Sequence, residues 1–175
     1  MKKLSLAIVC VLTMAAWTSA QSPLPDCPDL VRALQDMMRA VIALHPDVVV
    51  ILAGTNDIAG NTGPMTDAEI EGNLTSMCEL AQASRIRVVL SSITPVGEAH
   101  RRAPARIVAI NTWLRAYAAE HHPVYLDYYA AMVDERGLLQ ADLSEDDLHP
   151  NAKGYAVMAP LAEAAVQRAL AIAWR

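Results

Sequence analysis

Two short motifs in this chain bring together residue types that can move protons and donate hydrogen bonds. Gly54-Thr55-Asn56-Asp57 follows an apolar run, and Asp146-Asp147-Leu148-His149-Pro150 lies near the carboxyl terminus. Asp146 and His149 are three residues apart in a predicted turn, and Pro150 restricts His149 to an extended backbone. This spacing can point a carboxylate and an imidazole at the same edge of the fold, which is the pairing that general acid–base chemistry uses.

Each motif alone is a weak signal, because glycine, asparagine and aspartate are common in ordinary turns. Their order is more specific, since the first follows a predicted buried strand and the second precedes the last predicted helix. In this order they resemble two signature blocks of the SGNH (GDSL-type) ester hydrolases. The resemblance extends over nearly the whole chain from about Val31 onward.

The resemblance implies a role for each site residue. Asn56, with Gly54 in the same block, would donate a side-chain N–H to an oxyanion, worth about 3 kcal/mol of transition-state stabilisation. His149 would be the general base, and the family spacing makes Asp146 rather than Asp147 the residue that orients its ring. The substrate would be a small carboxyl ester, a thioester, a lysophospholipid or an acetylated sugar. No metal and no cofactor is expected, because no metal-spacing motif accompanies these residues.

The chain departs from the family at the nucleophile. The Gly-Asp-Ser block that carries the attacking serine does not occur in this sequence, and the glycine block that completes the oxyanion hole is missing as well. Ser92, at the end of a predicted strand, is the candidate substitute nucleophile; the competing interpretation is a strand-end serine bonded to backbone. Alternatively, His149 activates water with the help of Asp146, and general-base catalysis of this kind contributes about 10²–10⁴-fold.

The absent block leaves three interpretations open. The chain is an ester hydrolase with a weakened site, or it is a catalytically inactive remnant that binds acyl groups or carbohydrate as a pseudoenzyme. The third interpretation is an internal deletion or frame error near Leu30, which removed about 50–60 residues of strand–helix sequence from a normal enzyme.

The elements that would position these residues alternate along the chain. Residues 29–44, residues 66–84 and the stretches that begin at Pro104 and Asn151 carry apolar residues at helical spacing. Apolar runs at 47–53, 86–90 and 124–126 are typical of strands buried on both faces of a parallel sheet. This alternation predicts an α/β layer fold, in which ligands bind beyond the carboxyl ends of the strands.

The resemblance makes this a flavodoxin-like three-layer α/β/α fold, with the parallel sheet truncated to about three strands. Residues 48–52 would then form an edge strand instead of an interior one. An unpaired apolar edge predicts self-association of the chain.

The chain begins with a predicted targeting segment. Lys2 and Lys3 precede the apolar run 4–17, and Thr18-Ser19-Ala20 offers small residues for cleavage. We therefore expect a signal peptide at 1–20, a Pro-rich tether at 21–28 and an SGNH hydrolase-like domain at 29–175 that is incomplete at its N-terminal side. This organisation predicts a periplasmic or secreted protein, and the apolar run is too short to span a bilayer comfortably.

The length and net charge of the chain limit the classes of partner that we expect. A chain of 175 residues with a formal net charge of −5 is expected to be one acidic domain, which argues against nucleic acid and anionic membranes as partners. Export would place Cys27 and Cys78 in an oxidising compartment. The sequence leaves open whether these two cysteines pair or whether Cys78 is a buried thiol on the apolar face of its helix.

Overall fold

The structure is a computed structural model that describes residues 6–10, 39–61, 63–100 and 103–173. Within these residues, four strands form one parallel sheet in the order β1-β2-β3-β4. The strands are β1 (Leu6–Cys10), β2 (Val48–Leu52), β3 (Arg87–Ser91) and β4 (Val124–Leu126). In the centre of the sheet, Val50 lies opposite Ile8 of β1 on one side and opposite Val89 of β3 on the other.

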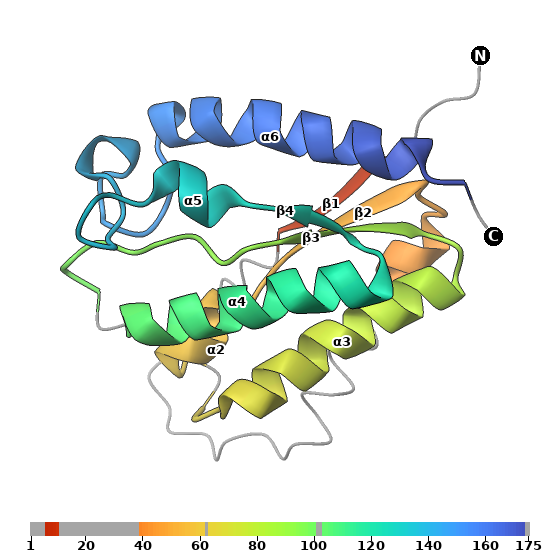
Figure 1. The fold of residues 1–175 in the computed structure, drawn as a ribbon, viewed down its shortest axis with the longest axis horizontal. Helices are drawn as coiled ribbons and strands as arrows, with labels where there is room; N and C mark the ends of the chain where they lie inside the picture. The colour runs from red at the N-terminus through yellow and green to blue at the C-terminus, as the bar shows by residue number, and fades with distance from the viewer. Residues whose placement is uncertain (1–5, 11–38, 62, 101–102, 174–175) are drawn as a thin grey trace.

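Helices connect the strands and cover both faces of the sheet (Figure 1). They are α2 (Thr55–Ala59), α3 (Asp67–Ala83), α4 (Pro104–His121), α5 (Tyr128–Met132), the 3-10 helix η1 (Ala141–Leu143) and α6 (Ala152–Ala171). The α3 and α4 helices lie on one face and α6 lies on the other (Figure 1). The predicted α/β fold with a parallel sheet between helical layers is therefore confirmed.

Two hydrophobic cores lie on opposite faces of the sheet, and β2 contributes to both. Val49 and Ile51 belong to the core that α3 and α4 cover, whereas Val48 and Val50 belong to the core that α6 covers. Successive side chains of a strand point to opposite faces. A continuous apolar run is therefore what a strand buried on both faces requires.

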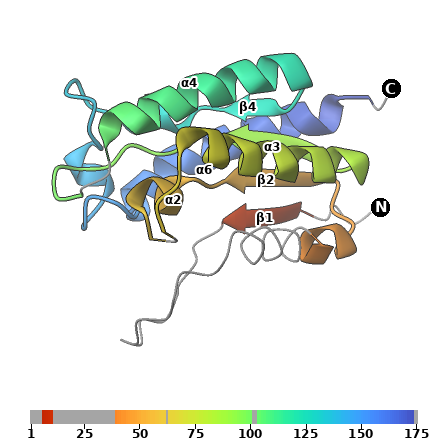
Figure 2. The same ribbon diagram turned by 90° about the horizontal axis from the view of Figure 1, so that it is seen from below.

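The strands predicted from apolar runs are β2, β3 and β4, and β1 is an addition. Because β1 pairs with β2, residues 48–52 form an interior strand, and the edge position expected for them is wrong. The β1 strand lies inside the segment that the sequence predicts as a signal peptide, and it pairs with β2 over five positions. Figure 2 shows β1 at the outer edge of the sheet, beyond β2. A short apolar run suits a signal peptide or a strand equally well, so periodicity does not reveal this long-range pairing. The predicted tether and residues 29–38 of the first predicted helix lie outside the described residues, and residues 39–43 are helical.

Two helices begin where the sequence predicts, and each begins at a side-chain cap. The Thr66 hydroxyl accepts a hydrogen bond from the Glu69 N–H at 3.3 Å, and the Glu69 carboxylate accepts one from the Thr66 N–H at 2.7 Å, which is a capping box. The Asn151 side chain caps α6 by accepting from the N–H groups of Lys153 and Gly154. None of the helices in the described part of the chain is long and apolar enough to cross a membrane.

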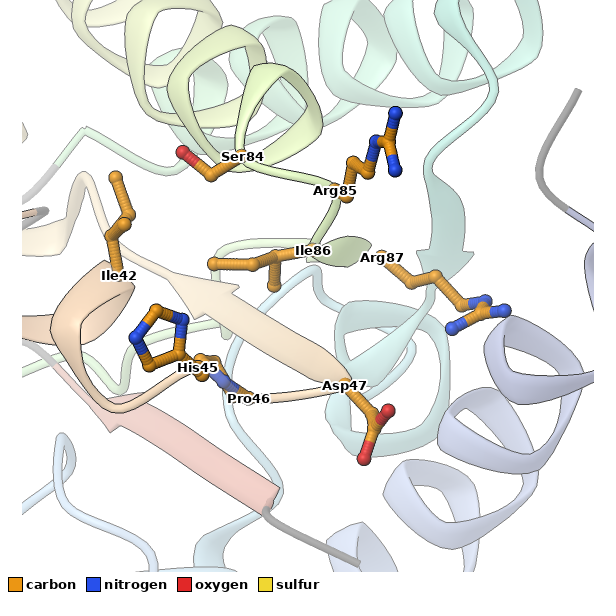
Figure 3. A pocket seen from close by; sticks show the side chains of 8 residues that line it. All are labelled: Ile42, His45, Pro46, Asp47, Ser84, Arg85, Ile86 and Arg87. Carbon is orange, nitrogen blue, oxygen red and sulfur yellow. The ribbon is translucent and has the colours of Figure 1, made fainter.

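A pocket of about 250 Å³ opens at the amino ends of β2 and β3 (Figure 3). It is lined by residues of the two loops that precede these strands, together with one residue of the helical segment 39–43 and the first residue of β3: Ile42, His45, Pro46, Asp47, Ser84, Arg85, Ile86 and Arg87. The first motif follows the carboxyl end of β2, and the second lies in the turn between η1 and α6, beyond β4 in the chain. Parallel sheets bind their ligands beyond the carboxyl ends of their strands. This pocket therefore lies at the edge of the sheet opposite the motifs.

One buried side chain attaches the chain beyond β3 to α4. Asn111 Oδ1 accepts a hydrogen bond from the Ile93 N–H at 2.7 Å, and Asn111 Nδ2 donates one to the Ile93 carbonyl at 2.9 Å. Both residues are buried. Because Ile93 lies two residues beyond the end of β3, the amide takes the place of hydrogen bonds from a neighbouring strand.

We expect Asn111→Ala to lower the free energy of unfolding by about 2–4 kcal/mol, because it leaves a buried N–H and a buried C=O of Ile93 without their partner. Urea denaturation followed by circular dichroism measures this. Thr112→Ala, at the exposed neighbouring position of α4, is the control and should change the free energy by less than about 0.5 kcal/mol. An Asn111→Ala effect as small as the control's would show that Ile93 is satisfied in another way.

Removal of residues 1–20 takes away β1 and exposes the apolar edge of β2. We expect a chain that begins at Gln21 to self-associate more strongly than the full chain at equal concentration, because unpaired strand edges bind one another. Size-exclusion chromatography with light scattering measures the difference. A monodisperse, shortened monomer with the melting temperature of the full chain would show that β1 is dispensable.

Candidate active site

Asn56 lies in α2, directly beyond the carboxyl end of β2. Gly54 caps this helix with a φ of 106°, a left-handed conformation that favours glycine. A Cβ atom at Gly54 would lie 2.7 Å from Cδ1 of Ile93, so the close contact also requires glycine. Asn61 donates to Asn56 twice, from its side chain to Oδ1 and from its backbone N–H to the carbonyl, each at 3.0 Å. These bonds set the rotation of the Asn56 amide, with Nδ2 on the side away from Asn61.

Asp146 and His149 form a hydrogen-bonded pair on the turn between η1 and α6. His149 Nδ1 lies 2.6 Å from Asp146 Oδ2. An ionised carboxylate can only accept, so Nδ1 carries the proton and Nε2 of the neutral ring presents its lone pair. The side chain of His149 is 58% exposed, and that of Asp146 is 53% exposed. Solvent therefore reaches the ring that carries the basic nitrogen.

The same turn stabilises the charge of Asp146. Oδ1 accepts hydrogen bonds from the backbone N–H of His149 at 2.7 Å and of Leu148 at 3.1 Å. The hydrogen bond from the His149 ring, followed by that from the His149 backbone, holds the pKa of Asp146 well below its ordinary value. Asp146 therefore remains an anion wherever His149 can act as a base.

Ser144 organises this turn, although no sequence pattern above identifies it as a site residue. Its hydroxyl lies 2.8 Å from the His149 carbonyl oxygen and 3.1 Å from Asp146 Oδ1, and it shares its proton between these acceptors. The hydroxyl oxygen also accepts from the Leu148 N–H at 3.1 Å. A bridge between Ser144 and Pro150 closes the base of the turn. Serine two residues before an aspartate is a signal for such side-chain-to-backbone turns.

Asp147 contributes to the turn differently from Asp146. It adopts a left-handed conformation with a φ of 62°. Its carbonyl accepts a hydrogen bond from the Gly97 N–H at 2.8 Å, and its Oδ2 accepts one from the Ala99 N–H at 3.3 Å. The side chain of Asp147 therefore faces the loop that follows β3, and it is Asp146 that contacts the His149 ring.

Ser92, the candidate substitute for the missing nucleophile, lies in the interior of the protein. Ser92 is fully buried, and its hydroxyl accepts a hydrogen bond from the Tyr129 N–H at 2.8 Å. The neighbouring Ser91 hydroxyl donates to the Ser92 carbonyl at 2.9 Å. A nucleophile must reach both its base and its substrate. Ser91 and Ser92 instead bond to backbone, which is the competing interpretation given above.

Cys78 is also unsuited to attack a substrate. It is a free, buried thiol in α3. Burial, with a smaller contribution from the charge of Glu79, raises the pKa of this thiol to about 12. The reactive thiolate is therefore scarce at neutral pH. Cys27, whose pairing with Cys78 the sequence leaves open, lies outside the described residues.

Both motifs lie at the carboxyl edge of the sheet. The α2 helix, α5 and the turn that precedes α6 gather at one end of the molecule, on the left in Figure 1. Among the residues that the structure describes, no group of three or more His, Cys, Asp and Glu side chains could hold a metal ion. The candidate site therefore consists of an oriented amide and an acid–base pair at the edge where α/β folds bind ligands.

An acid–base pair can transfer protons, and an amide donor can stabilise a developing negative charge. The model of the GDSL-like lipase/acylhydrolase family matches residues 7–157. The chain belongs to this family. The match begins within β1 and includes both motifs.

Solved structures of related proteins are similar to the chain. A protein described as an acylhydrolase from Bacteroides fragilis is 36% identical with a TM-score of 0.75, over 80% of this chain and 70% of that one. A GDSL-like lipase from Bacteroides thetaiotaomicron is 36% identical with a TM-score of 0.74, over 79% and 71%. A mutant of an acetyl-xylooligosaccharide esterase from Geobacillus is 24% identical with a TM-score of 0.62, over 82% and 68%, and shares the fold. No curated protein matches the chain.

We expect Asp146 to titrate below the ordinary aspartate pKa of about 3.9, and His149→Ala to raise its pKa part of the way back, since the backbone hydrogen bonds remain. Carboxyl ¹³C shifts measured by NMR against pH would show both effects. Because the folded-state pKa is depressed, the stabilisation from this pair is present above the ordinary pKa and is lost as the pH falls through the lower, folded value.

His121→Ala is the control for this titration. His121 is exposed at the end of α4, and its removal should leave the Asp146 titration unchanged. An Asp146 titration that is the same with and without the His149 ring would contradict the assignment of that ring as the main cause of the shift.

Proposed function

We propose that this chain is a carboxyl-ester hydrolase in which His149 is the general base, Asp146 orients it and Asn56 stabilises the oxyanion. The observation that carries the proposal is the 2.6 Å contact between His149 Nδ1 and Asp146 Oδ2. It selects the tautomer that a general base needs, with the lone pair on Nε2. Family membership supports acyl-ester chemistry at this edge of the sheet.

In the proposed reaction, water takes the place of the serine that the sequence lacks. His149 Nε2 removes a proton from water as the water oxygen bonds to the ester carbonyl carbon. The carbonyl π electrons move to oxygen and form a tetrahedral oxyanion. When this intermediate collapses, the bond to the alcohol oxygen breaks and His149 Nε2 returns the proton to the leaving alcohol. The products are a carboxylic acid and an alcohol, and Asp146 stabilises the imidazolium throughout.

Asn56 has the donor that the oxyanion needs. Its Oδ1 accepts from Asn61, which directs Nδ2 to the other side of the amide. A single well-placed oxyanion donor accounts for about 10²–10³-fold in kcat. Such a donor acts only on the charge that develops in the transition state.

Small acetyl esters are the proposed substrates, with acetylated sugars as the natural class. The His149 ring and the Asp146 carboxylate are both more than half exposed, so an acetyl group on a large, soluble molecule can approach them. The similarity in fold to an acetyl-xylooligosaccharide esterase supports testing this class first. We further propose that the protein is exported, on the basis of Lys2, Lys3 and the apolar run that follows them.

A second candidate function follows from the missing Gly-Asp-Ser sequence. A chain without a nucleophile could bind acyl groups or carbohydrate at this edge without cleaving them. Binding of an acetylated oligosaccharide without turnover would favour this pseudoenzyme function over hydrolysis.

We expect slow hydrolysis of 4-nitrophenyl acetate by the full chain, falling about 100-fold or more in His149→Ala because general-base catalysis is lost. Asn56→Ala should lower kcat by a similar factor, and His121→Ala should leave the rate unchanged. Release of 4-nitrophenolate, followed by its absorbance, measures all four proteins. Folded full-length protein with no turnover above background would overturn the hydrolase proposal, and an initial burst of product would show a covalent intermediate in place of direct attack by water.

A further inference from the structure

A second histidine lies against the backbone of the acid–base pair. His100 belongs to the loop that follows β3, and its Nε2 lies 2.7 Å from the carbonyl oxygen of Asp146. A carbonyl oxygen only accepts, so His100 Nε2 carries the proton and donates it. The bond persists when the His100 ring is protonated, because both ring nitrogens are then donors.

The same loop holds the neighbouring residue of the turn. The Gly97 N–H donates to the Asp147 carbonyl at 2.8 Å, and the Ala99 N–H donates to Asp147 Oδ2 at 3.3 Å. A Cβ atom at Gly97 would lie 2.3 Å from Cγ of Asp147, so the loop and the turn approach as closely as glycine allows. Three donors from residues 97–100 thus reach two consecutive residues of the turn.

We propose that His100 is a positioning residue for the Asp146–His149 pair. The effect of this positioning role on catalysis rests on the function proposed above. The carbonyl and the carboxylate of Asp146 belong to the same residue. The hydrogen bond from His100 to the carbonyl therefore restrains the backbone from which the Asp146 side chain extends. Asp146 is more than half exposed and receives little restraint from packing. The hydrogen bond from His100 comes from a distant part of the chain, whereas Ser144, Leu148 and His149 restrain Asp146 from within the turn itself.

The glutamine and asparagine variants of His100 make a matched test. The amide nitrogen of glutamine reaches the position of histidine Nε2, whereas that of asparagine reaches only the position of Nδ1. We therefore expect His100→Gln to preserve the pair and His100→Asn to loosen it. His121→Ala, which alters an exposed histidine at the far end of α4, is the control for a general loss of one imidazole.

The measurement is the tautomer of His149 in the ¹⁵N-labelled full chain, read from the ring-nitrogen shifts correlated to the carbon-bound ring protons. Imidazole in water prefers the Nε2–H tautomer, so a dominant Nδ1–H tautomer reports the contact with Asp146. We expect the ratio of Nδ1–H to Nε2–H to fall roughly fivefold to tenfold in His100→Asn, about the effect of one hydrogen bond. His100→Gln and His121→Ala should keep the ratio of the unmodified chain.

A ratio in His100→Asn equal to that of the unmodified chain would overturn the proposal, even if the melting temperature falls, because His100 would then be only a structural group. The same conclusion follows if the unmodified chain shows no excess of the Nδ1–H tautomer. If His100→Asn does not fold, His100→Leu, whose side chain has no hydrogen-bond donor, is the reference variant. A ratio of Nδ1–H to Nε2–H that is as low in His100→Gln as in His100→Leu would then overturn the proposal. Ester hydrolysis is measured separately: absence of turnover with the expected tautomer ratios would remove the proposed function and leave the positioning role intact.

Discussion

The two hydrogen bonds between the Asn111 side chain and the Ile93 backbone connect the separate parts of the carboxyl edge. Ile93 is fully buried, and its side chain contacts Gly54 so closely that a Cβ atom there would clash. Ile93 therefore packs directly against the N-cap residue of α2, the helix that carries Asn56. Beyond Ile93 the same segment reaches Gly97, which bonds to Asp147. One amide on α4 thus links the two motifs, which are far apart in sequence.

The acid–base turn depends far less on the rest of the fold than Asn56 does. Ser144, Asp146, Leu148 and His149 satisfy one another through short-range hydrogen bonds, and Asn151 starts α6 directly after them. Such contacts lose little chain entropy on formation, because their residues are already neighbours. The hydrogen bonds from residues 97–100, and the packing of Leu148 against the core that α3 and α4 cover, connect this turn to distant parts of the chain. The position of the turn relative to Asn56 is therefore a tertiary property, whereas its internal geometry is local.

This difference explains which parts of the molecule could be predicted from sequence. The apolar run at Val48–Leu52 and the helical spacing that begins at Thr66 are local patterns, and the strand and the helix appear in the structure where these patterns place them. The strand β1 was not predicted, because an apolar run does not show which strand it pairs with. The roles of Asn111 and His100 were not identified from the sequence, because their hydrogen-bond partners, Ile93 and Asp146, are remote in sequence. Ser92 looked available at a strand end, yet β4 and the start of α5 bury it.

The Asp146–His149 pair is the part of the proposed site that short-range contacts can build. A carboxylate and an imidazole three residues apart meet within one turn, whereas a nucleophile needs an element of its own to carry it toward them. The pair is well oriented but open to solvent, and water screens the charge that should stabilise the imidazolium. Its catalytic value therefore rises only when a bound substrate excludes that water. Without such closure, orientation alone limits the site to about the 10²–10⁴-fold that a general base contributes.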